Sequence, residues 1–420
     1  MSPAMPLLNQ ERLWRSTQEL ARFTLPDQPW TRRAFSELFM QSRQWLQAQF
    51  EQAGLTVHVD AAGNLIGRRE GRKPGLAPIT TGSHCDTVMY GGRYDGIIGV
   101  LAGLEVARCL DEQGVELDHP FEVVDFLSEE PSDYGVSCVG SRAMGGVLSA
   151  AMLAERNPRG ETLAQGIARI GGRPAELDRV RRAPGDTAAF VELHIEQGPV
   201  LESRQLPIGV VSNIVGICRH RLVVEGRPDH AGTTPMDIRR DALVGASLII
   251  GAVDRKARAY LGGPDYVVAT IGNLNLTPNA SNAVPGRVEM MVEVRSDRQD
   301  IMESFTCELL EELRPGIEAM GLGLEAAQVS LARPTDCHPG VMRVISEAAA
   351  SLGYRSMTMP SGAGHDAVYM AGSGPMGMIF IPCLNGRSHC PEESITSGQL
   401  LDGARVLYQT IVMLDRALES

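Results

Sequence analysis

Three consecutive segments of the chain decide the fold: APITTG (residues 77–82), DGIIGVLAGLEVARCLDEQ (95–113) and FEVVDFL (121–127). The first and third are short runs rich in apolar and β-branched residues, as in buried strands. The segment between them repeats apolar and small residues at helical spacing. A strand, a helix and a second strand in this order predict a βαβ unit, and therefore a largely parallel sheet.

The segments on either side fit the same α/β architecture. Upstream, a helical pattern precedes two short strands at the edge of the sheet, and these elements are expected at residues 31–54, 56–59 and 64–68. The α/β pattern returns after residue 333 with a helix, an apolar strand and a closing helix, expected at 341–352, 376–381 and 397–418. One mixed, largely parallel sheet flanked by helices should therefore include both ends of the chain.

The middle of the chain has a different character. Its expected strands are 219–224, 266–274 and 287–295, and its expected helices are 240–260 and 299–320. This pattern predicts a two-layer α+β domain inserted into the α/β domain. We therefore expect a catalytic domain of residues 1–211 and 332–420 and an insert of residues 212–331, with linkers near 210–212 and 331–334 that allow the insert to rotate.

Composition excludes several classes of partner. The chain of 420 residues carries 39 basic and 51 acidic residues, a formal charge of -12, which disfavours nucleic acid and anionic membranes. Residues 1–20 resemble an amphipathic helix rather than a secretory signal. The longest apolar run, 243–253, is about half of the ~20 residues needed to cross a bilayer. Eight cysteines without a C-x-x-C pair fit a reducing compartment, so a soluble cytoplasmic protein is expected.

Five candidate metal ligands lie at or shortly after expected strands: His84, Asp95, Glu130, His194 and His389. Each has an ordinary explanation alone, such as a structural histidine, a helix N-cap, surface charge or turn chemistry. Ligands of open α/β sheets collect at the strand ends, and together these five make a purely structural explanation improbable. Three imidazoles and two carboxylates suit two divalent ions (Zn, or Mn, Co or Ni) if one carboxylate bridges them.

Two further carboxylates have expected roles beside the ligands. Asp86 follows His84 by two residues, and it could accept the imidazole N–H and so fix the tautomer of a ligating histidine. Glu129 precedes Glu130 and is left without a metal to bind. It is therefore the expected general base for a water molecule that metal ions activate.

Seven tracts closely resemble the amidase and hydantoinase-associated carbamoylase family, which includes N-carbamoyl-L-amino acid hydrolases, β-ureidopropionases and allantoate amidohydrolases. The family is related to aminoacylases and dinuclear exopeptidases. The tracts are GSHCDTV (82–88), GGRYD (91–95), SEE (128–130), ELHIEQG (192–198), DHAGTTPM (229–236), SGAGHD (361–366) and SH (388–389). By this resemblance His84, Asp95 and His194 would hold one metal ion, and Asp95, Glu130 and His389 the other.

The resemblance also implies roles for the insert, as a lid and as the surface of a homodimer. His230 would stabilise the developing oxyanion in the partner's site. Asn282 and Arg295 would bind the substrate, and Arg295 would pair with the carboxylate of the substrate. From the residues alone, these three could equally be a turn cap, a turn former and an exposed ion pair. Three residues of the catalytic domain are expected to contact substrate as well, and they are Gln197, Gly364 and His365; a turn and cap are the alternative for His365.

The sequence thus predicts hydrolysis of the N-carbamoyl (ureido) group of an N-carbamoyl-L-amino acid, giving an amino acid, ammonia and carbon dioxide. Alternatives are an allantoate or ureidoglycolate-type amidohydrolase, an N-acyl amino acid or dipeptide hydrolase, and a catalytically silent dimeric binding protein. The chain departs from many family members at PSDY (131–134) and at Cys85 and Cys390, which adjoin two ligand histidines. These departures leave the chemistry intact and the substrate open.

Overall fold

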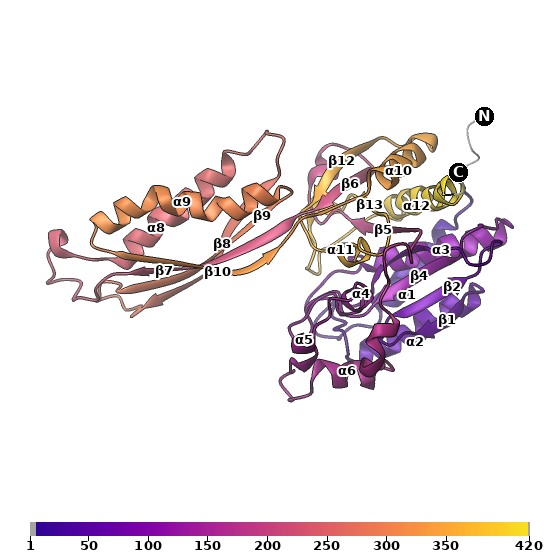
Figure 1. Ribbon diagram of the computed structural model, residues 1–420, viewed down its shortest axis with the longest axis horizontal. Coiled ribbons are helices and arrows are strands. Elements are labelled where there is room, and N and C mark those ends of the chain that lie inside the picture. The colour runs from indigo at the N-terminus through magenta and orange to yellow at the C-terminus, as the bar shows by residue number, and fades with distance from the viewer. Residues whose placement is uncertain (1–5, 419–420) are drawn as a thin grey trace. The chain divides into compact units, whose positions relative to one another are not determined.

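The computed structural model describes residues 6–418 and divides the chain into two compact units (Figure 1). Unit 1 comprises Met1–Ser212 with Cys337–Ser420, and unit 2 comprises Asn213–Asp336. The second boundary lies five residues beyond the expected 331/332, because a short strand, β11 (Thr335–Asp336), follows the last long strand of the insert. The expected N-terminal helix is α1 (Gln10–Ala21), and residues 1–5 of that prediction lie outside the described residues.

Unit 1 contains eight of the nine strands of the larger sheet, in the order β1-β2-β4-β3-β5-β13-β6, with β12 paired to β6. The central strands β4, β3, β5 and β13 run parallel, which confirms the predicted α/β class. The strands are β1 (Thr56–Val59), β2 (Leu65–Arg69), β3 (Ile79–His84), β4 (Phe121–Phe126), β5 (Ala189–Ile195), β6 (Ile208–Ile214), β12 (Ser356–Ser361) and β13 (Met376–Ile381).

The long helices of unit 1 pack against this sheet and share its apolar core. The helix α3 (Ile97–Glu112) is buried along most of its length, which explains why its sequence is apolar on nearly every side. The others are α2 (Glu37–Gln52), α4 (Val139–Met144), α5 (Ala150–Ala154), α6 (Leu163–Arg169), η1 (Pro174–Arg179), α7 (Val200–Ser203), α10 (Pro339–Ser351), α11 (Ala367–Met370), η3 (Leu384–Gly386) and α12 (Ser397–Ala417). Within residues 6–418, no helix has the length and apolar character needed to span a membrane.

Unit 2 is a two-layer α+β structure with an antiparallel sheet in the order β10-β7-β9-β8. Two helices, α8 and α9, lie side by side along this sheet (Figure 1) and bury one of its faces. The buried and partly exposed residues of β9 alternate, as expected for a strand with one covered face. The elements are β7 (Gly216–Glu225), η2 (Met236–Ile238), α8 (Ala242–Arg258), β8 (Val267–Thr277), β9 (Arg287–Ser296), α9 (Gln299–Ala319) and β10 (Gly323–Ala332).

The expected linkers overlap the ends of strands. Residues 210–212 lie within β6, which pairs with β13, and residues 331–332 end β10, which pairs with β7. Residues 333–334, between β10 and β11, belong to no strand. The prediction also lacks β10 as a strand. Most of its side chains are exposed at the sheet edge, so its sequence shows little strand-like alternation.

Candidate metal centre

The expected ligands come together at the carboxyl edge of the parallel strands of unit 1. His84 is the last residue of β3, Glu130 follows β4, and His194 is the penultimate residue of β5. His389 follows β13, which pairs with β5. Because these four strands are neighbours, residues up to 305 positions apart in the chain meet at one place.

A first group consists of His84, Asp95 and His194, whose ligand atoms all lie within 4.8 Å of one another. The Nε2 atoms of His84 and His194 lie 3.7 and 3.1 Å from Asp95 Oδ1. Gly96 makes this approach possible. Its φ is +69°, its N–H donates to His194 Nε2 at 3.0 Å, and a Cβ at this position would overlap the His84 imidazole.

The opposite nitrogens of both imidazoles are held by main-chain carbonyls. His84 Nδ1 donates to the Asp86 carbonyl oxygen at 3.1 Å, and His194 Nδ1 donates to the Ile195 carbonyl oxygen at 2.8 Å. A carbonyl only accepts, so each Nδ1 carries a proton. In the neutral form of each imidazole, which is the form that binds a metal ion, Nε2 carries the lone pair and lies near Asp95.

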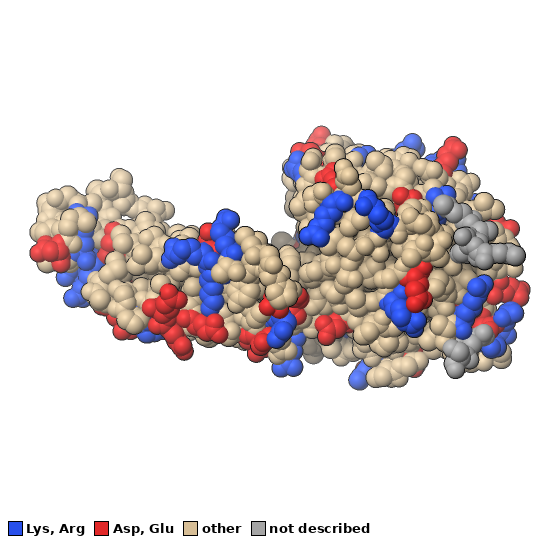
Figure 2. Space-filling model, turned by 90° about the horizontal axis from the view of Figure 1, so that it is seen from above, with Lys and Arg blue, Asp and Glu red and all other residues tan. Residues whose placement is uncertain are grey.

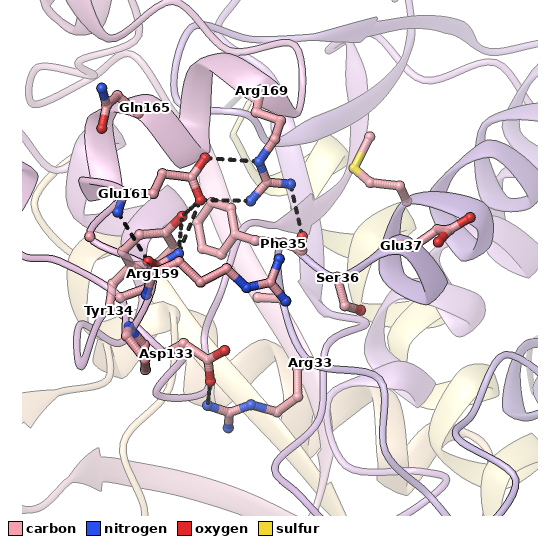
Figure 3. Close-up of a pocket in the computed structure, with 15 residues that line it drawn as sticks. Arg33, Phe35, Ser36, Glu37, Asp133, Tyr134, Arg159, Glu161, Gln165 and Arg169 are labelled. Carbon is pink, nitrogen blue, oxygen red and sulfur yellow. Dashed lines mark hydrogen bonds and ion pairs between the residues drawn. The ribbon is translucent and has the colours of Figure 1, made fainter.

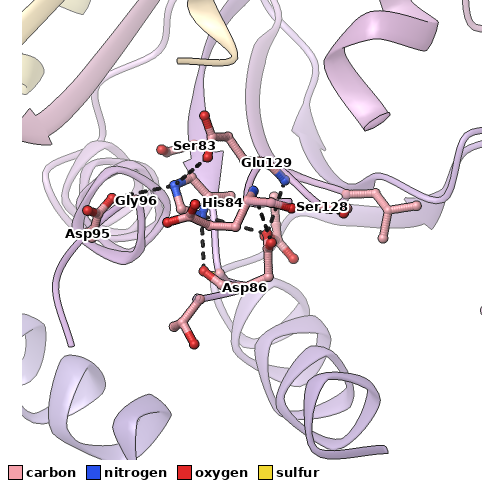
Figure 4. Close-up of polar contacts among 12 residues, drawn as sticks. Ser83, His84, Asp86, Asp95, Gly96, Ser128 and Glu129 are labelled. Atoms are coloured by element: carbon pink, nitrogen blue, oxygen red, sulfur yellow. Dashed lines mark hydrogen bonds and ion pairs between the residues drawn. The ribbon is translucent and has the colours of Figure 1, made fainter. Parts of the chain in front are cut away.

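Asp86 holds the site differently from the prediction. Its carboxylate lies 3.6 Å from His84 Nδ1, farther than its own main-chain carbonyl oxygen. The carboxylate instead accepts the main-chain N–H groups of Glu129 and Glu130 at 3.3 and 3.2 Å (Figure 4). Asp86 thus ties the loop after β3 to the loop that carries the two glutamates.

A second group consists of Asp95, Glu130 and His389. His389 Nε2 lies 3.3 Å from Asp95 Oδ2 and 3.0 Å from Glu130 Oε1. These hydrogen bonds raise the pKa of His389 to about 11. Asp95 belongs to both groups and directs one carboxylate oxygen to each, which is the geometry a bridging ligand needs. His389 is half exposed, whereas both acids are buried.

Glu129 lies beside the first group. Its Oε2 is 3.6 Å from His84 Nε2, and the thiol of Cys138 lies 3.5 Å from its Oε1. Burial, followed by the charge of Glu130, raises the pKa of Glu129 well above its ordinary value. Nothing in the sequence around Cys138 marks this contact. Cys85, which adjoins the candidate ligand His84 in the sequence, is also buried, and burial raises the pKa of its thiol.

Gln197 contacts the shared ligand and keeps one polar atom unused. Its Nε2 donates to Asp95 Oδ2 at 2.6 Å and lies 3.5 Å from His389 Nε2. Its Oε1 is buried and has no hydrogen-bond partner within residues 6–418. The amide therefore presents a free acceptor beside the candidate metal ligands.

The structure places the two residues expected in the 361–366 loop differently from each other. Gly364 is exposed, with open space around it. His365, predicted to contact substrate, is 2% exposed. Its Nε2 lies 2.8 Å from the Ser361 hydroxyl, and its ring packs edge-on against His194 with centroids 4.5 Å apart. His365 therefore supports a candidate ligand rather than facing solvent.

The remaining candidates, His230, Asn282 and Arg295, belong to unit 2. His230 and Asn282 are neighbours there, because the N–H of Ala231 donates to the Asn282 carbonyl at 2.9 Å. His230 is exposed, and its Nδ1 accepts two main-chain N–H groups, at 3.1 and 3.2 Å. Its Nε2 consequently carries the proton and is a hydrogen-bond donor. Arg295, on β9, donates to Glu293 at 2.8 Å.

A separate pocket of about 1080 Å³ has none of the candidate ligands in its lining (Figure 3). It includes Asp133 and Tyr134 of the tract that departs from the family. The Tyr134 hydroxyl donates to Glu161 at 2.6 Å, and Arg169 forms a two-pronged ion pair with the same carboxylate. These bonds, Arg169 first, lower the pKa of Glu161 to about 2. The departing tract is thus braced by a polar network outside the ligand cluster.

Ser388, which the sequence analysis includes only as part of the SH tract, and Glu393, which it does not include, have no predicted role. Both contact the Asp95 segment. Glu393 stands in a Pro-Glu-Glu run that looks like ordinary surface charge, so the sequence holds no signal for its burial.

Comparisons with known proteins place this geometry in a family. Residues 77–413 match the model of peptidase family M20/M25/M40. The N-carbamoyl-L-amino-acid amidohydrolase of Paenarthrobacter aurescens is 37% identical over 407 residues, 97% of this chain and 98% of that protein. The ureidoglycolate hydrolase of Oryza sativa subsp. japonica is 35% identical over 410 residues, 95% and 84% of the two chains.

A solved structure extends the similarity to three dimensions. The hydantoinase/carbamoylase family amidase from Burkholderia multivorans is 36% identical with a TM-score of 0.88, over 97% of this chain and 98% of that one. The resemblance predicted from the sequence motifs is therefore confirmed. The matched region contains every strand that carries a candidate ligand, and the chain belongs to peptidase family M20/M25/M40, whose members are metal-dependent.

Proposed function

We propose that the chain hydrolyses the N-carbamoyl group of an N-carbamoyl-L-amino acid and releases an amino acid, ammonia and carbon dioxide. The observation that carries this proposal is the pair of ligand groups that share Asp95, with Glu129 beside them. Near end-to-end similarity to N-carbamoyl-L-amino-acid amidohydrolases supports the choice of reaction. A catalytically silent binding protein would have no need for this complete arrangement.

The donor atoms fit two divalent cations. Histidine nitrogens and carboxylate oxygens are ligands of Zn, Mn, Co and Ni, and a cation bound by these groups would offset the charge of the buried carboxylates. His84, Asp95 and His194 would hold one ion, and Asp95, Glu130 and His389 the other. When bound, such ions polarise the carbonyl of the scissile bond and lower the pKa of an attacking water.

The residues of the chain would then move the protons. Glu129 accepts a proton from the attacking water on its carboxylate and delivers it to the leaving nitrogen of the amino acid. Its position beside His84, with its main-chain N–H held by Asp86, keeps that carboxylate next to the ligand cluster. The Nε2–H of His230 would donate to the oxyanion that develops on the carbamoyl oxygen.

Gln197 favours a ureido substrate over an N-acyl one. Its buried Oε1 lacks a partner within residues 6–418, and an unpaired buried acceptor is costly. The terminal NH₂ of a ureido group would supply a donor, whereas an acetyl group has none. Arg295 and Asn282 would bind the substrate carboxylate, since a guanidinium pairs well with a carboxylate.

An ammonia-release screen tests the proposal directly. The chain, reconstituted with each of the four metals, would be offered N-carbamoyl-L-amino acids, 3-ureidopropionate, allantoate, ureidoglycolate and N-acetyl amino acids. We expect turnover of N-carbamoyl-L-amino acids such as N-carbamoyl-L-methionine. Preferred turnover of allantoate or ureidoglycolate would replace the substrate but keep the chemistry. Hydrolysis of N-acetyl amino acids alone would overturn the ureido assignment.

We also propose that the chain forms a homodimer through unit 2. The helix α8 buries one side against the sheet, yet its other side exposes large apolar residues, and they are Leu243, Val244, Leu248 and Ile250. The free edge strand β8 adds two more, Val268 and Leu274. A second copy would cover this apolar surface. Sedimentation velocity should show that the native chain is a dimer and that Leu248→Glu dissociates it. The control Val147→Glu, at an exposed site of unit 1, should leave the dimer intact. A monomeric native chain would contradict this proposal.

A cytoplasmic location completes the proposal. Each of the eight cysteines, all within the described residues, is a free thiol, as a reducing compartment would keep it. On the face in Figure 2, basic and acidic side chains are interspersed, with no extended basic surface of the kind that nucleic acid or anionic lipid requires.

A further inference from the structure

Glu393 is a buried acid at the junction of two loops that carry candidate ligands. Glu393 is 1% exposed. Its Oε1 accepts the main-chain N–H groups of Tyr94 and Asp95, at 2.7 and 3.1 Å. Its Oε2 lies 2.7 Å from the hydroxyl of Ser388, and the same hydroxyl contacts Asp95 Oδ2. Glu393 therefore contacts the main chain of the Asp95 segment directly and the side chain of Asp95 through Ser388.

Gly92 shows that the chain is built around this contact. A Cβ at Gly92 would overlap the carboxyl group of Glu393, so only glycine lets the carboxylate lie against the 91–95 segment. The second glycine of the GGRYD tract thus has a packing reason. The contact also spans 298 residues between Asp95 and Glu393, so it joins two distant parts of the chain.

We propose that Glu393 is a positioning residue of the metal centre, which acts through Ser388 to fix the shared ligand Asp95 and to join its loop to that of His389. This inference deepens the proposed function and rests on the two-ion centre described there. Asp95 would contribute a ligand atom to both groups, so a rotation of its side chain would move both of its oxygens away from the other candidate ligands. The Ser388 hydroxyl has one hydrogen, so when it donates to Asp95 Oδ2, the oxygen that faces His389, its Oγ accepts a hydrogen from the Glu393 carboxyl group.

The expected size of the effect follows from the behaviour of groups that support metal ligands. Loss of such a partner typically lowers metal affinity or activity about 10–100-fold. A purely structural buried carboxylate would lower the stability of the whole chain instead and leave the metal affinity of the folded fraction unchanged. Metal affinity therefore separates the two roles.

Three variants of the full chain make the test. Glu393→Ala removes the carboxyl contacts, Glu393→Gln keeps an acceptor for both N–H groups and a donor for Ser388, and Glu392→Ala is a matched control at an exposed neighbour that pairs with Arg387. Affinity for both ions would be measured by chelator competition with Zn²⁺, and ligand geometry by the visible spectrum of the Co²⁺ form. We expect a loss of about 10–100-fold for Glu393→Ala, near-native affinity for Glu393→Gln and no change for Glu392→Ala.

Two results would overturn the inference: native affinity for both ions in Glu393→Ala, or a loss in Glu393→Gln equal to that in the alanine variant. If Glu393→Ala does not fold by circular dichroism, Ser388→Ala tests the same link at a partly exposed site, and native affinity there would also overturn it. A native chain that binds no metal would defeat the proposed metal centre itself. Failure of the positioning role is thereby distinguished from failure of the proposed function.

Discussion

Replacing Glu129 with Gln isolates the proton-transfer step, because the change removes a charge and a basic site but preserves the shape of the side chain. Asp86 holds the main-chain N–H of Glu129, so the position of the backbone does not depend on the carboxylate. Glu129 is also absent from both ligand groups. The variant should therefore keep its metal ions while it loses the group that accepts the proton of water.

The expected loss is large. General acid–base catalysis contributes roughly 10²–10⁴-fold in rate, which corresponds to about 2.7–5.5 kcal/mol of transition-state stabilisation. Glu129 is proposed to act twice, first on the attacking water and then on the leaving nitrogen. We therefore expect kcat to fall by about 10³–10⁴-fold. KM should change little, because the groups proposed to bind substrate are other residues.

The assay is ammonia release from N-carbamoyl-L-methionine, with metal content measured by mass spectrometry on the same preparations. Glu130→Gln is the matched control. It makes the same chemical change one residue away, but at a candidate ligand, so metal and activity should fall together. Turnover of Glu129→Gln within about tenfold of the native rate, with full metal content, would refute the acid–base role.

Three further outcomes are expected. His389→Ala should retain one ion per chain instead of two, because the other ligand group is intact, and two ions in plasma mass spectrometry would remove His389 from the ligand set. Mixing His230→Ala with Glu129→Gln should restore part of the activity if His230 serves the partner's site; no recovery after verified subunit exchange would place it elsewhere. Because folding lowers the pKa of Glu161, its carboxylate stabilises the folded chain at pH values above the ordinary pKa of 4.5. This stability is lost as pH falls through about 2. Urea unfolding should thus show Glu161→Gln less stable than the native chain at neutral pH, with a gap that narrows in acid; a constant gap would contradict this.

The fold and the ligand cluster were within reach of the sequence because both follow local rules. Buried strands can be predicted from their apolar composition, and neighbouring parallel strands place their carboxyl ends at the same edge of the sheet. His84 and His194 could therefore be placed near each other without any long-range information. The strand β10 escaped prediction because an exposed edge strand has no need to alternate.

What escaped prediction in the site depends on packing between distant segments. Glu393 and its neighbour Glu392 are chemically identical, yet one is buried against the Asp95 segment and the other is exposed. Only the tertiary structure distinguishes them. The ring of His365, for which the sequence left a substrate contact and a turn and cap open, is buried and packs edge-on against His194. A polar side chain in a glycine-rich loop does not reveal the direction in which it points.

Gly96 sets a limit on how the chain can vary. A Cβ at this one position would overlap the His84 imidazole, and its left-handed backbone is one that few other residues adopt. In a library of all single substitutions, Gly96 should be depleted as severely as the histidines, although it offers no donor atom. Any effort to redesign the substrate preference of this scaffold must therefore leave this glycine unchanged and seek its diversity elsewhere.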